Sequence, residues 1–282
     1  MSVDKPEGVT SHDVVDTIRD GFGCRRVGHA GTLDPPATGV LVIGIGRATR
    51  LLRFVTAQTK EYEAEMRLGV ETSTLDASGE VVAVHDMSGI RADDVRAVAD
   101  RFRGRIEQTP PMVSAVRVGG RRLHELARQG REVERPTRVV EIHELSVEPI
   151  DETGGLYKLR VRCSSGTYVR SLVADLGAAL GGGAHVTRLR RTAVGSFRVE
   201  DANPPSEPVL LDPRRAVADL PAVRAEGRLV RAVVSGRLLG REELGVEGRG
   251  PWAVFGNDGE LLAVYEEEGE RLRPAVVWAA VS

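Results

Sequence analysis

One aspartate stands within a stretch of glycines and prolines that leads directly into an apolar run. The stretch reads GHAGTLDPPATGVL from Gly28 to Leu41, with the acid at Asp34. Glycines permit φ > 0 and close approach of a ligand, whereas consecutive prolines fix φ and remove N–H donors. We therefore expect Asp34 on a stiff loop that precedes a buried strand at 40–45. For an Asp-Pro pair alone, a tight turn capped by the aspartate is the more common structure.

Composition limits the class of protein. A chain of 282 residues with 41% hydrophobic residues can bury the core of one large domain and one small one. No apolar stretch approaches the length of a bilayer, and the N-terminal residues lack a basic segment followed by an apolar run, so we expect a cytoplasmic location. Cys24 and Cys163 form neither a disulfide framework nor a metal motif, and the histidines show no ligand spacing with them. We expect no metal.

The charge is unevenly distributed along the chain. The formal net charge is −2, which is unusual for a nucleic-acid-binding protein. Between Val116 and Val140, however, seven arginines stand against three glutamates, whereas 266–270 is acidic. The planar guanidinium suits phosphate contacts and stacking on bases, so the segment is a candidate RNA contact. A solvated arginine-rich surface explains the same charges equally well.

The apolar spacing predicts an α/β (α+β) protein in which strands dominate. Helices are expected after a cap at Thr10 or Ser11 and ending at Gly21 or Gly23, at 92–102, within 121–130 and at 168–180. Strands are expected at 40–45, 60–68, 112–118, 139–147 and 157–163, with a pair within 184–199.

A change in composition near residue 204 predicts a boundary. Pro204, Pro205, Pro208 and Pro213 indicate a linker. We expect a first domain at 1–203 with a basic insertion at about 117–138, a linker at 204–219 and a small domain at 220–282. Short strands at 252–255, 261–265 and 272–278 after a helix at 228–239 favour a small β-barrel in the last part.

Three segments, in this order along the chain, resemble motifs of one known family. They are the stretch around Asp34, Thr59–Ala64 with its Lys-x-Tyr pattern, and Ser165–Leu172, which reads SGTYVRSL. Together they are similar to the bacterial tRNA pseudouridine synthases that modify uridine 55 in the T-loop. The resemblance extends from Val3 to about Val199. It implies the pseudouridine synthase fold, with a mixed, mostly antiparallel central sheet flanked by helices and loops.

The resemblance also implies roles for individual residues. Asp34 would be the catalytic acid, Arg170 would hold it and keep it ionised at low pH, and Tyr62 would stack on the base and help remove the C5 proton. Substrate-binding roles are implied for Lys5, which supports the loop, and for His29, Tyr168 and Leu189. The basic insertion would contact the RNA stem through Arg121, Arg122 and Arg128. On residue type alone, Tyr62 and Leu189 are as readily explained as core side chains, and Arg170 as a surface arginine.

The implied reaction breaks the N1–C1′ bond of uridine and rejoins the base through C5, without a cofactor. An ionised carboxylate can attack C6 of uracil or C1′ of ribose, or assist deprotonation at C2′, and the sequence does not choose among these roles. The expected partner is the T-stem-loop of tRNA, with no membrane and no obligate protein partner, and the chain is expected to be a monomer.

Three other functions fit parts of the sequence. The first is a tRNA-binding or tRNA-folding protein that has lost its reaction. The second is the catalytic subunit of a guide-RNA pseudouridylation complex, although the insertion at 120–128 is similar to the stand-alone enzymes instead. The third is a glycoside hydrolase, which usually needs a second acid in register with Asp34.

Overall fold

Two main sheets and several short helices make up the protein. The computed structural model describes residues 1–114, 117–118, 121–122 and 133–279. The large sheet has the order β1-β3-β12-β4-β11-β10-β7, with β2 paired to β3 and β13 to β12. Its strands are β1 (Ser2–Lys5), β2 (Val27–Ala30), β3 (Thr38–Ile45), β4 (Lys60–Leu68), β7 (Gly104–Gln108), β10 (Arg138–Asp151), β11 (Leu156–Cys163), β12 (Ala184–Val194) and β13 (Phe197–Arg198).

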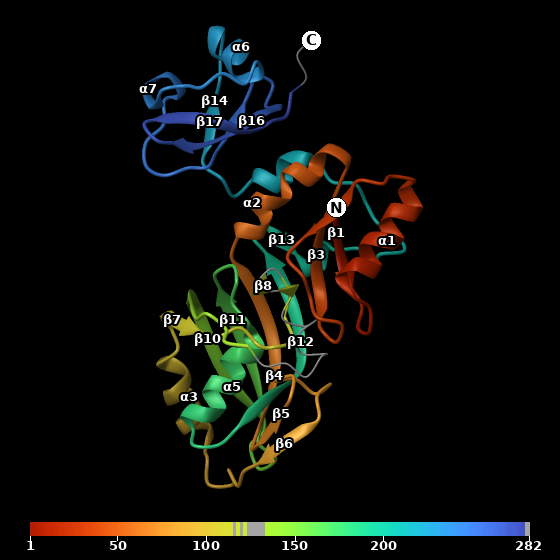
Figure 1. Ribbon diagram of the computed structural model, residues 1–282, viewed down its shortest axis with the longest axis vertical. Coiled ribbons are helices and arrows are strands. Elements are labelled where there is room, and N and C mark those ends of the chain that lie inside the picture. The colour runs from red at the N-terminus through yellow and green to blue at the C-terminus, as the bar shows by residue number, and fades with distance from the viewer. Residues whose placement is uncertain (115–116, 119–120, 123–132, 280–282) are drawn as a thin grey trace.

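The large sheet is mixed and mostly antiparallel, as predicted. Its parallel pairing joins β12 to β3, where Arg190 lies opposite Thr38 and Arg191 opposite Gly39. The long strands β12 and β4 pair antiparallel along the centre of the sheet (Figure 1). This parallel pairing places the start of β3, which follows the Asp34 loop, beside β12, although the two strands are far apart in the sequence.

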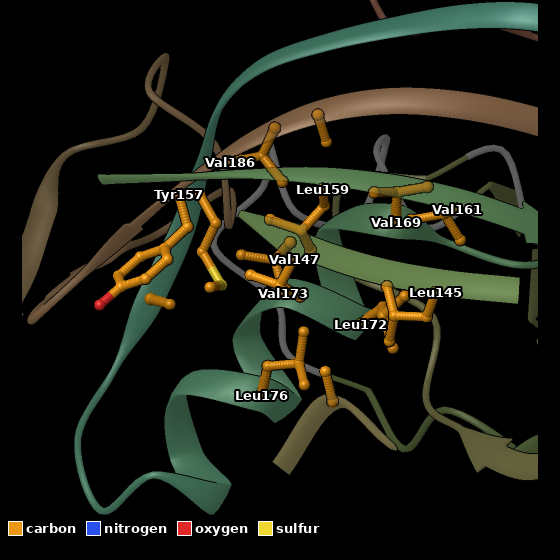
Figure 2. Close-up of a cluster of buried hydrophobic side chains, with 14 of the residues drawn as sticks. Leu145, Val147, Tyr157, Leu159, Val161, Val169, Leu172, Val173, Leu176 and Val186 are labelled. Carbon is orange, nitrogen blue, oxygen red and sulfur yellow. The ribbon is translucent and has the colours of Figure 1, made fainter. Parts of the chain in front are cut away.

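Helices α3 (Ala92–Asp100) and α5 (Val169–Ala179) pack on one face of the sheet. Figure 2 shows the core between α5 and the strands, in which Leu172 lies beside Leu145 and Val173 beside Val147. Apolar and charged residues alternate along β4, so one face is buried and the other carries a row of glutamates. The buried face fixes the register of β4, because a slip of one residue would turn the glutamates into the core.

Helix α1 (Ser11–Phe22) confirms its predicted ends. Thr10 is its N-cap in a capping box with Asp13, and Gly23 ends it in the left-handed conformation at φ 58°. Val14 and Ile18 are buried against the N-terminal strands. Between β3 and β4 the chain forms a 3₁₀ turn at Gly46–Arg50 and helix α2 (Leu52–Ala57).

The segment between α3 and the basic insertion differs from its prediction. The expected strand at 112–118 is wrong for 112–114, which form bends, and only β8 (Arg117–Val118) is a strand, paired with β9 (Arg121–Arg122). Backbone groups of 112–114 bond elsewhere, since the Val113 carbonyl accepts from Arg170. Strand β7 was not predicted. The helix expected within 121–130 falls on 123–130, outside the described residues.

Two smaller pairings complete the region near the site. Strands β5 (Val70–Thr72) and β6 (Val81–Val84) form a hairpin, whose connecting loop contains Asp76. Val186 of β12 forms an isolated bridge with Asp76, which ties that loop to the large sheet.

The C-terminal part forms an open sheet, and the closed barrel expected there is not found in the described residues. The order is β14-β15-β16-β17, with β14 and β17 at the edges. The strands are β14 (Ala222–Arg224), β15 (Trp252–Phe255), β16 (Leu261–Glu268) and β17 (Arg271–Val277), and two helices accompany them, α6 (Arg228–Val234) and α7 (Arg241–Leu244). With so few strands, the sheet covers its apolar residues with helices instead of closing on itself.

Helix α2 lies between the two sheets (Figure 1). Leu51 and Phe54 pack in one buried cluster with Val217 of the 3₁₀ turn Pro213–Val217 and with Ala253 and Val264 of the small sheet. A further 3₁₀ turn, Val199–Asp201, follows β13. The domain limits 1–203, 204–219 and 220–282 remain our proposal. None of the described helices has the length and apolar character to cross a membrane.

Candidate active site

Asp34 and Arg170 meet in a direct ion pair. The Asp34 loop follows β2, and Arg170 is the second residue of α5, yet their Oδ2 and Nη2 atoms are 2.8 Å apart. The Asp34 side chain is 35% exposed, whereas that of Arg170 is 4% exposed. The arginine is thus held inside the protein, and the carboxylate keeps an open side.

Arg170 is fixed by three further acceptors. Its Nη1 donates to the Thr74 carbonyl at 2.7 Å and its Nη2 to the Val113 carbonyl at 2.8 Å. Its Nη1 also lies 3.5 Å from Oδ2 of Asp76. A guanidinium with its donors engaged in several directions has little freedom to move, so it presents a fixed positive edge to Asp34.

Asp76 belongs to the site, and the sequence analysis missed it. Its Oδ1 accepts from the Thr74 hydroxyl at 2.6 Å and from the Ser78 amide at 3.0 Å. The acid therefore caps its own loop and offers its other oxygen to Arg170. A Thr-x-Asp-x-Ser pattern is common in turns, so this stretch alone could not have indicated a site.

Burial raises the pKa of the Asp34 carboxyl above its ordinary value. The Arg170 charge opposes this rise, whereas the nearby Asp76 charge adds to it. Arg170 thus favours the ionised form of Asp34, as expected, but it does not bring the pKa of the carboxyl below its ordinary value. Protein encloses the carboxylate on all but its open side, and its desolvation outweighs the ion pair.

The open side of Asp34 faces a pocket of about 270 Å³. Two aromatic side chains and one aliphatic side chain from three different elements line it, namely Tyr62, Tyr168 and Leu189. Burial raises the pKa of the Tyr62 phenol, and the adjacent Arg191 guanidinium works against that rise. Arg138 lies over the Tyr168 ring at 5.3 Å from its centroid. An apolar, aromatic pocket with one carboxylate at its wall suits a planar base.

Two buried polar side chains, Lys5 and Ser11, bond to the backbone of the Asp34 loop. The Lys5 ammonium donates to the carbonyls of Pro6 (2.8 Å), Val9 (2.7 Å) and Pro35 (3.1 Å). Burial lowers the pKa of Lys5 to about 8. The Ser11 hydroxyl donates to the Leu33 carbonyl and accepts from the Leu33 amide. The loop is rigid because its backbone groups are bonded to side chains of other elements.

Lys60 of the Lys-x-Tyr motif also borders the pocket. Its ammonium donates to the carbonyls of Thr56 and Gln58 at the end of α2. Burial lowers its pKa to about 8. The Ser165 hydroxyl donates to the same Thr56 carbonyl at 2.8 Å, so Lys60 ties α2, β4 and the 164–168 segment together.

The remaining predicted residues are His29, which does not line this pocket, and the three arginines of the basic insertion. His29 is half-buried in β2, where its ring meets that of His12 edge to face at 5.6 Å. Arg121 and Arg122 form β9, and Arg128 lies outside the described residues. The roles assigned to all of these residues remain predictions. Within the described ranges, no three His, Cys, Asp or Glu side chains gather as metal ligands.

Comparison with solved structures places the fold. The chain superimposes on a structure titled "Crystal Structure of a Cbf5-Nop10-Gar1 Complex" with a TM-score of 0.70 at 28% identity, covering 94% of this chain and 77% of that one. A second, titled "Crystal structure of the archaeal box H/ACA sRNP Nop10-Cbf5 complex", gives 0.68 at 26% identity, covering 94% and 78%. The fold and the pocket with its aspartate define a pseudouridine synthase.

Sequence relatives give the family. The model described as TruB family pseudouridylate synthase, N-terminal domain, matches residues 19–169, and that of the tRNA pseudouridylate synthase B C-terminal domain matches residues 170–204. The chain is 43% identical to tRNA pseudouridine synthase B of Mycobacterium avium (strain 104) and 45% identical to that of Mycobacterium sp. (strain KMS), in each case over 98% of this chain and 94% of the relative. The chain belongs to the TruB family of pseudouridylate synthases.

Proposed function

We propose that the enzyme converts uridine 55 in the T-loop of tRNA to pseudouridine, and that the Asp34 pocket is where this occurs. The observation that carries the proposal is the 2.8 Å pair of a partly exposed aspartate with a buried arginine at the wall of an aromatic pocket. The names of the relatives, tRNA pseudouridine synthase B, support tRNA as the substrate.

The reaction is an isomerisation within one nucleotide. The N1–C1′ bond breaks, the uracil turns within the pocket, and a C5–C1′ bond forms; C5 loses a proton and N1 gains one. No electrons are exchanged with another molecule, so the chemistry requires no redox cofactor. Attack by Asp34 on C6 or C1′, and its action as a base at C2′, all require the carboxylate to be ionised.

A uridine within a folded loop reaches this pocket only after it leaves the stack. Unstacking costs about a few kcal/mol, which contacts in the pocket must offset. Tyr62 and Tyr168 offer ring faces for the base, and Leu189 offers an apolar contact at the same wall. Tyr62 is also within the site where the C5 proton must be removed. We propose these three as substrate contacts and Tyr62 as the group that assists that proton transfer.

The wider partner assignment follows from the same site. We propose that the T-stem-loop is sufficient as substrate and that the chain acts as a monomer without an obligate protein partner. Tritium release from an isolated, 5-tritiated T-stem-loop RNA tests the first point, and sedimentation of the enzyme with and without that RNA tests the second. The loss of activity on an isolated T-stem-loop, or a dimer as the active species, would overturn this part of the proposal.

The test of the catalytic assignment is Asp34→Asn. Pseudouridine formation, followed by tritium release from 5-tritiated uridine in tRNA, should be abolished, while tRNA binding is largely retained because the side-chain volume is unchanged. Asp212→Asn is the matched control, since Asp212 pairs with Arg214 on the surface and lies away from the pocket. Full activity of Asp34→Asn would remove Asp34 from the mechanism. Tight binding by a wild-type protein with no turnover would instead favour a tRNA-binding protein without catalysis.

A further inference from the structure

Arg191 is buried beneath the Asp34 pocket, and the sequence analysis gave it no role. It is 1% exposed and heads the fully buried side chains by volume. Its Nε donates to the Val40 carbonyl at 2.8 Å and its Nη2 to the Gly31 carbonyl at 3.0 Å. Gly31 precedes Asp34 and Val40 follows it, so one guanidinium is bonded to both sides of the loop that carries the acid.

The same guanidinium reaches Tyr62. Arg191 and Tyr62 are register partners across β12 and β4, so their side chains leave the sheet on the same face. The Arg191 guanidinium favours the ionised form of the Tyr62 phenol, against the burial that raises the pKa of Tyr62. Both residues line the pocket. Arg191 therefore links the two elements that carry the acid and the aromatic ring.

The backbone around Arg191 allows little displacement. On its other side, Arg191 is the register partner of Gly39 in the parallel pairing with β3. A Cβ on Gly39, whose φ is 103°, would lie 2.1 Å from the Arg191 carbonyl oxygen. Glycine thus lets β3 approach β12 closely enough for the guanidinium to reach the carbonyls of Gly31 and Val40.

The bonding of Arg191 is directional. Among the described residues, Arg170 pairs with Asp34 and Asp76 and Arg190 pairs with Asp4, whereas Arg191 forms no ion pair. Its charge is satisfied by the carbonyl dipoles of Val40 and Gly31. A planar fork can meet acceptors in several directions at once, whereas a lysine ammonium is a compact charge on a flexible stem.

We propose that Arg191 is a positioning residue that fixes Tyr62 relative to Asp34 during the isomerisation. The inference rests on the proposed function of the Asp34 pocket. It adds the residue that fixes the Asp34 loop relative to β4, which carries Tyr62. The Asp34 carboxylate and the Tyr62 ring must contact the same uracil as it turns. Neither the Asp34 loop nor β4 alone sets the distance between these two side chains.

The first test is Arg191→Lys, with Arg190→Lys as the matched control in the same strand. Misplacement of reacting groups by about 1 Å can cost roughly a hundredfold in rate, so we expect Arg191→Lys to lose about tenfold to a hundredfold in single-turnover rate. Its Kd for tRNA should be unchanged, and Arg190→Lys should retain the wild-type rate. Rates are normalised to folded enzyme by circular dichroism. Arg191→Gln, which keeps two N–H donors, is measured in the same way in case the lysine variant does not fold.

A double-mutant cycle with Tyr62→Phe separates positioning from general stability. If Arg191 acts through Tyr62, the rate losses of Arg191→Lys and Tyr62→Phe should combine to less than their product. Losses that multiply fully, or a normal rate per folded molecule in Arg191→Lys, would overturn the inference. Asp34→Asn is run alongside. An inactive Asp34→Asn beside a normal Arg191→Lys would refute this inference alone, whereas an active Asp34→Asn would refute the proposed function.

Discussion

At the scale of single residues, the site places two acids against one arginine. Arg170 contacts Asp34 at 2.8 Å and Asp76 at 3.5 Å. Two negative charges share one positive charge, and the Asp76 charge makes ionisation of Asp34 less favourable. Burial and Asp76 both raise the pKa of Asp34, and Arg170 limits the rise. The reaction requires the ionised carboxylate, so the rate should fall as the pH drops below the raised pKa.

Asp76→Asn should change both the pH dependence and the maximum rate. Removal of the Asp76 charge takes away one cause of the raised pKa of Asp34, so Asp34 should ionise at lower pH. The acid limb of the pH–rate profile should therefore shift to lower pH. The plateau rate should also fall, because Arg170 loses a charged partner and gains freedom to move. The measurement is the single-turnover rate of pseudouridine formation across acid and neutral pH.

Asp100→Asn is the control for this shift. Asp100 is the last residue of α3 and pairs with Arg103 at the protein surface. Removal of the Asp100 charge therefore changes the net charge by the same amount, but away from the pocket. Its acid limb should coincide with that of the wild type. An Asp76→Asn limb that stays in place, or moves to higher pH, would show that Asp76 does not set the ionisation of Asp34.

At the scale of elements, a buried lysine holds the loop in place. Lys5 of β1 bonds to three carbonyls, one of them that of Pro35, directly after Asp34. Lys5 itself is fully buried, and its bonds join the segment after β1 to the Asp34 loop. The N-terminal strand is therefore part of the support of the site.

Lys5→Met should destabilise the fold and slow the reaction. Leaving buried acceptors without a donor costs about 1–3 kcal/mol in unfolding free energy, and the freed loop should also lower the turnover rate. Denaturant unfolding gives the first quantity and tritium release the second. Lys158→Met is the matched control, since Lys158 pairs with Glu63 at the surface and exposed pairs contribute about 0–1 kcal/mol. Equal stability losses in the two variants would argue against a supporting role for Lys5.

Elements with strong local signals could be predicted from the sequence. Helix α1 has a capping residue, an apolar face and a terminal glycine, and β4 alternates along its whole length. Strand β7 was missed because only alternate residues of Gly104–Gln108 are partly buried, which leaves a weak apolar pattern. The 112–114 segment was predicted as a strand because its apolar residues give no sign that Val113 bonds to Arg170.

The site could be predicted only in part for a similar reason. The family motifs indicated Asp34, Tyr62 and Arg170, and all three meet in one pocket or at its wall. Asp76 and Arg191 have no distinctive local pattern, because their roles depend on contacts with residues that are distant in the chain, Arg170 for Asp76 and Gly31 for Arg191. The raised pKa of Asp34 also depends on burial that the sequence does not reveal.

At the scale of the whole molecule, a net charge of −2 must be reconciled with an RNA substrate. On the outer face of the large sheet, arginines are neutralised by glutamates; Arg160 lies 3.3 Å from Glu63, and Arg162 lies 3.1 Å from Glu144. The segment 116–140 instead has an excess of arginine over glutamate. It joins the chain beside Val113, whose carbonyl contacts Arg170. The excess of positive charge that attracts phosphate is therefore concentrated in this part of the sequence.

Removal of charge from this segment should weaken tRNA binding in a salt-dependent manner. Each lost phosphate contact lowers the slope of log K against log salt by about 1, so Arg121→Ser combined with Arg122→Ser should flatten the slope and raise Kd most at low salt. The control removes two arginines that already have acidic neighbours, Arg160→Ser with Arg162→Ser. Their charges are largely screened by Glu63 and Glu144, so the slope should stay close to that of the wild type. If both pairs of substitutions change the slope equally, attraction of tRNA depends on net charge and not on the basic segment.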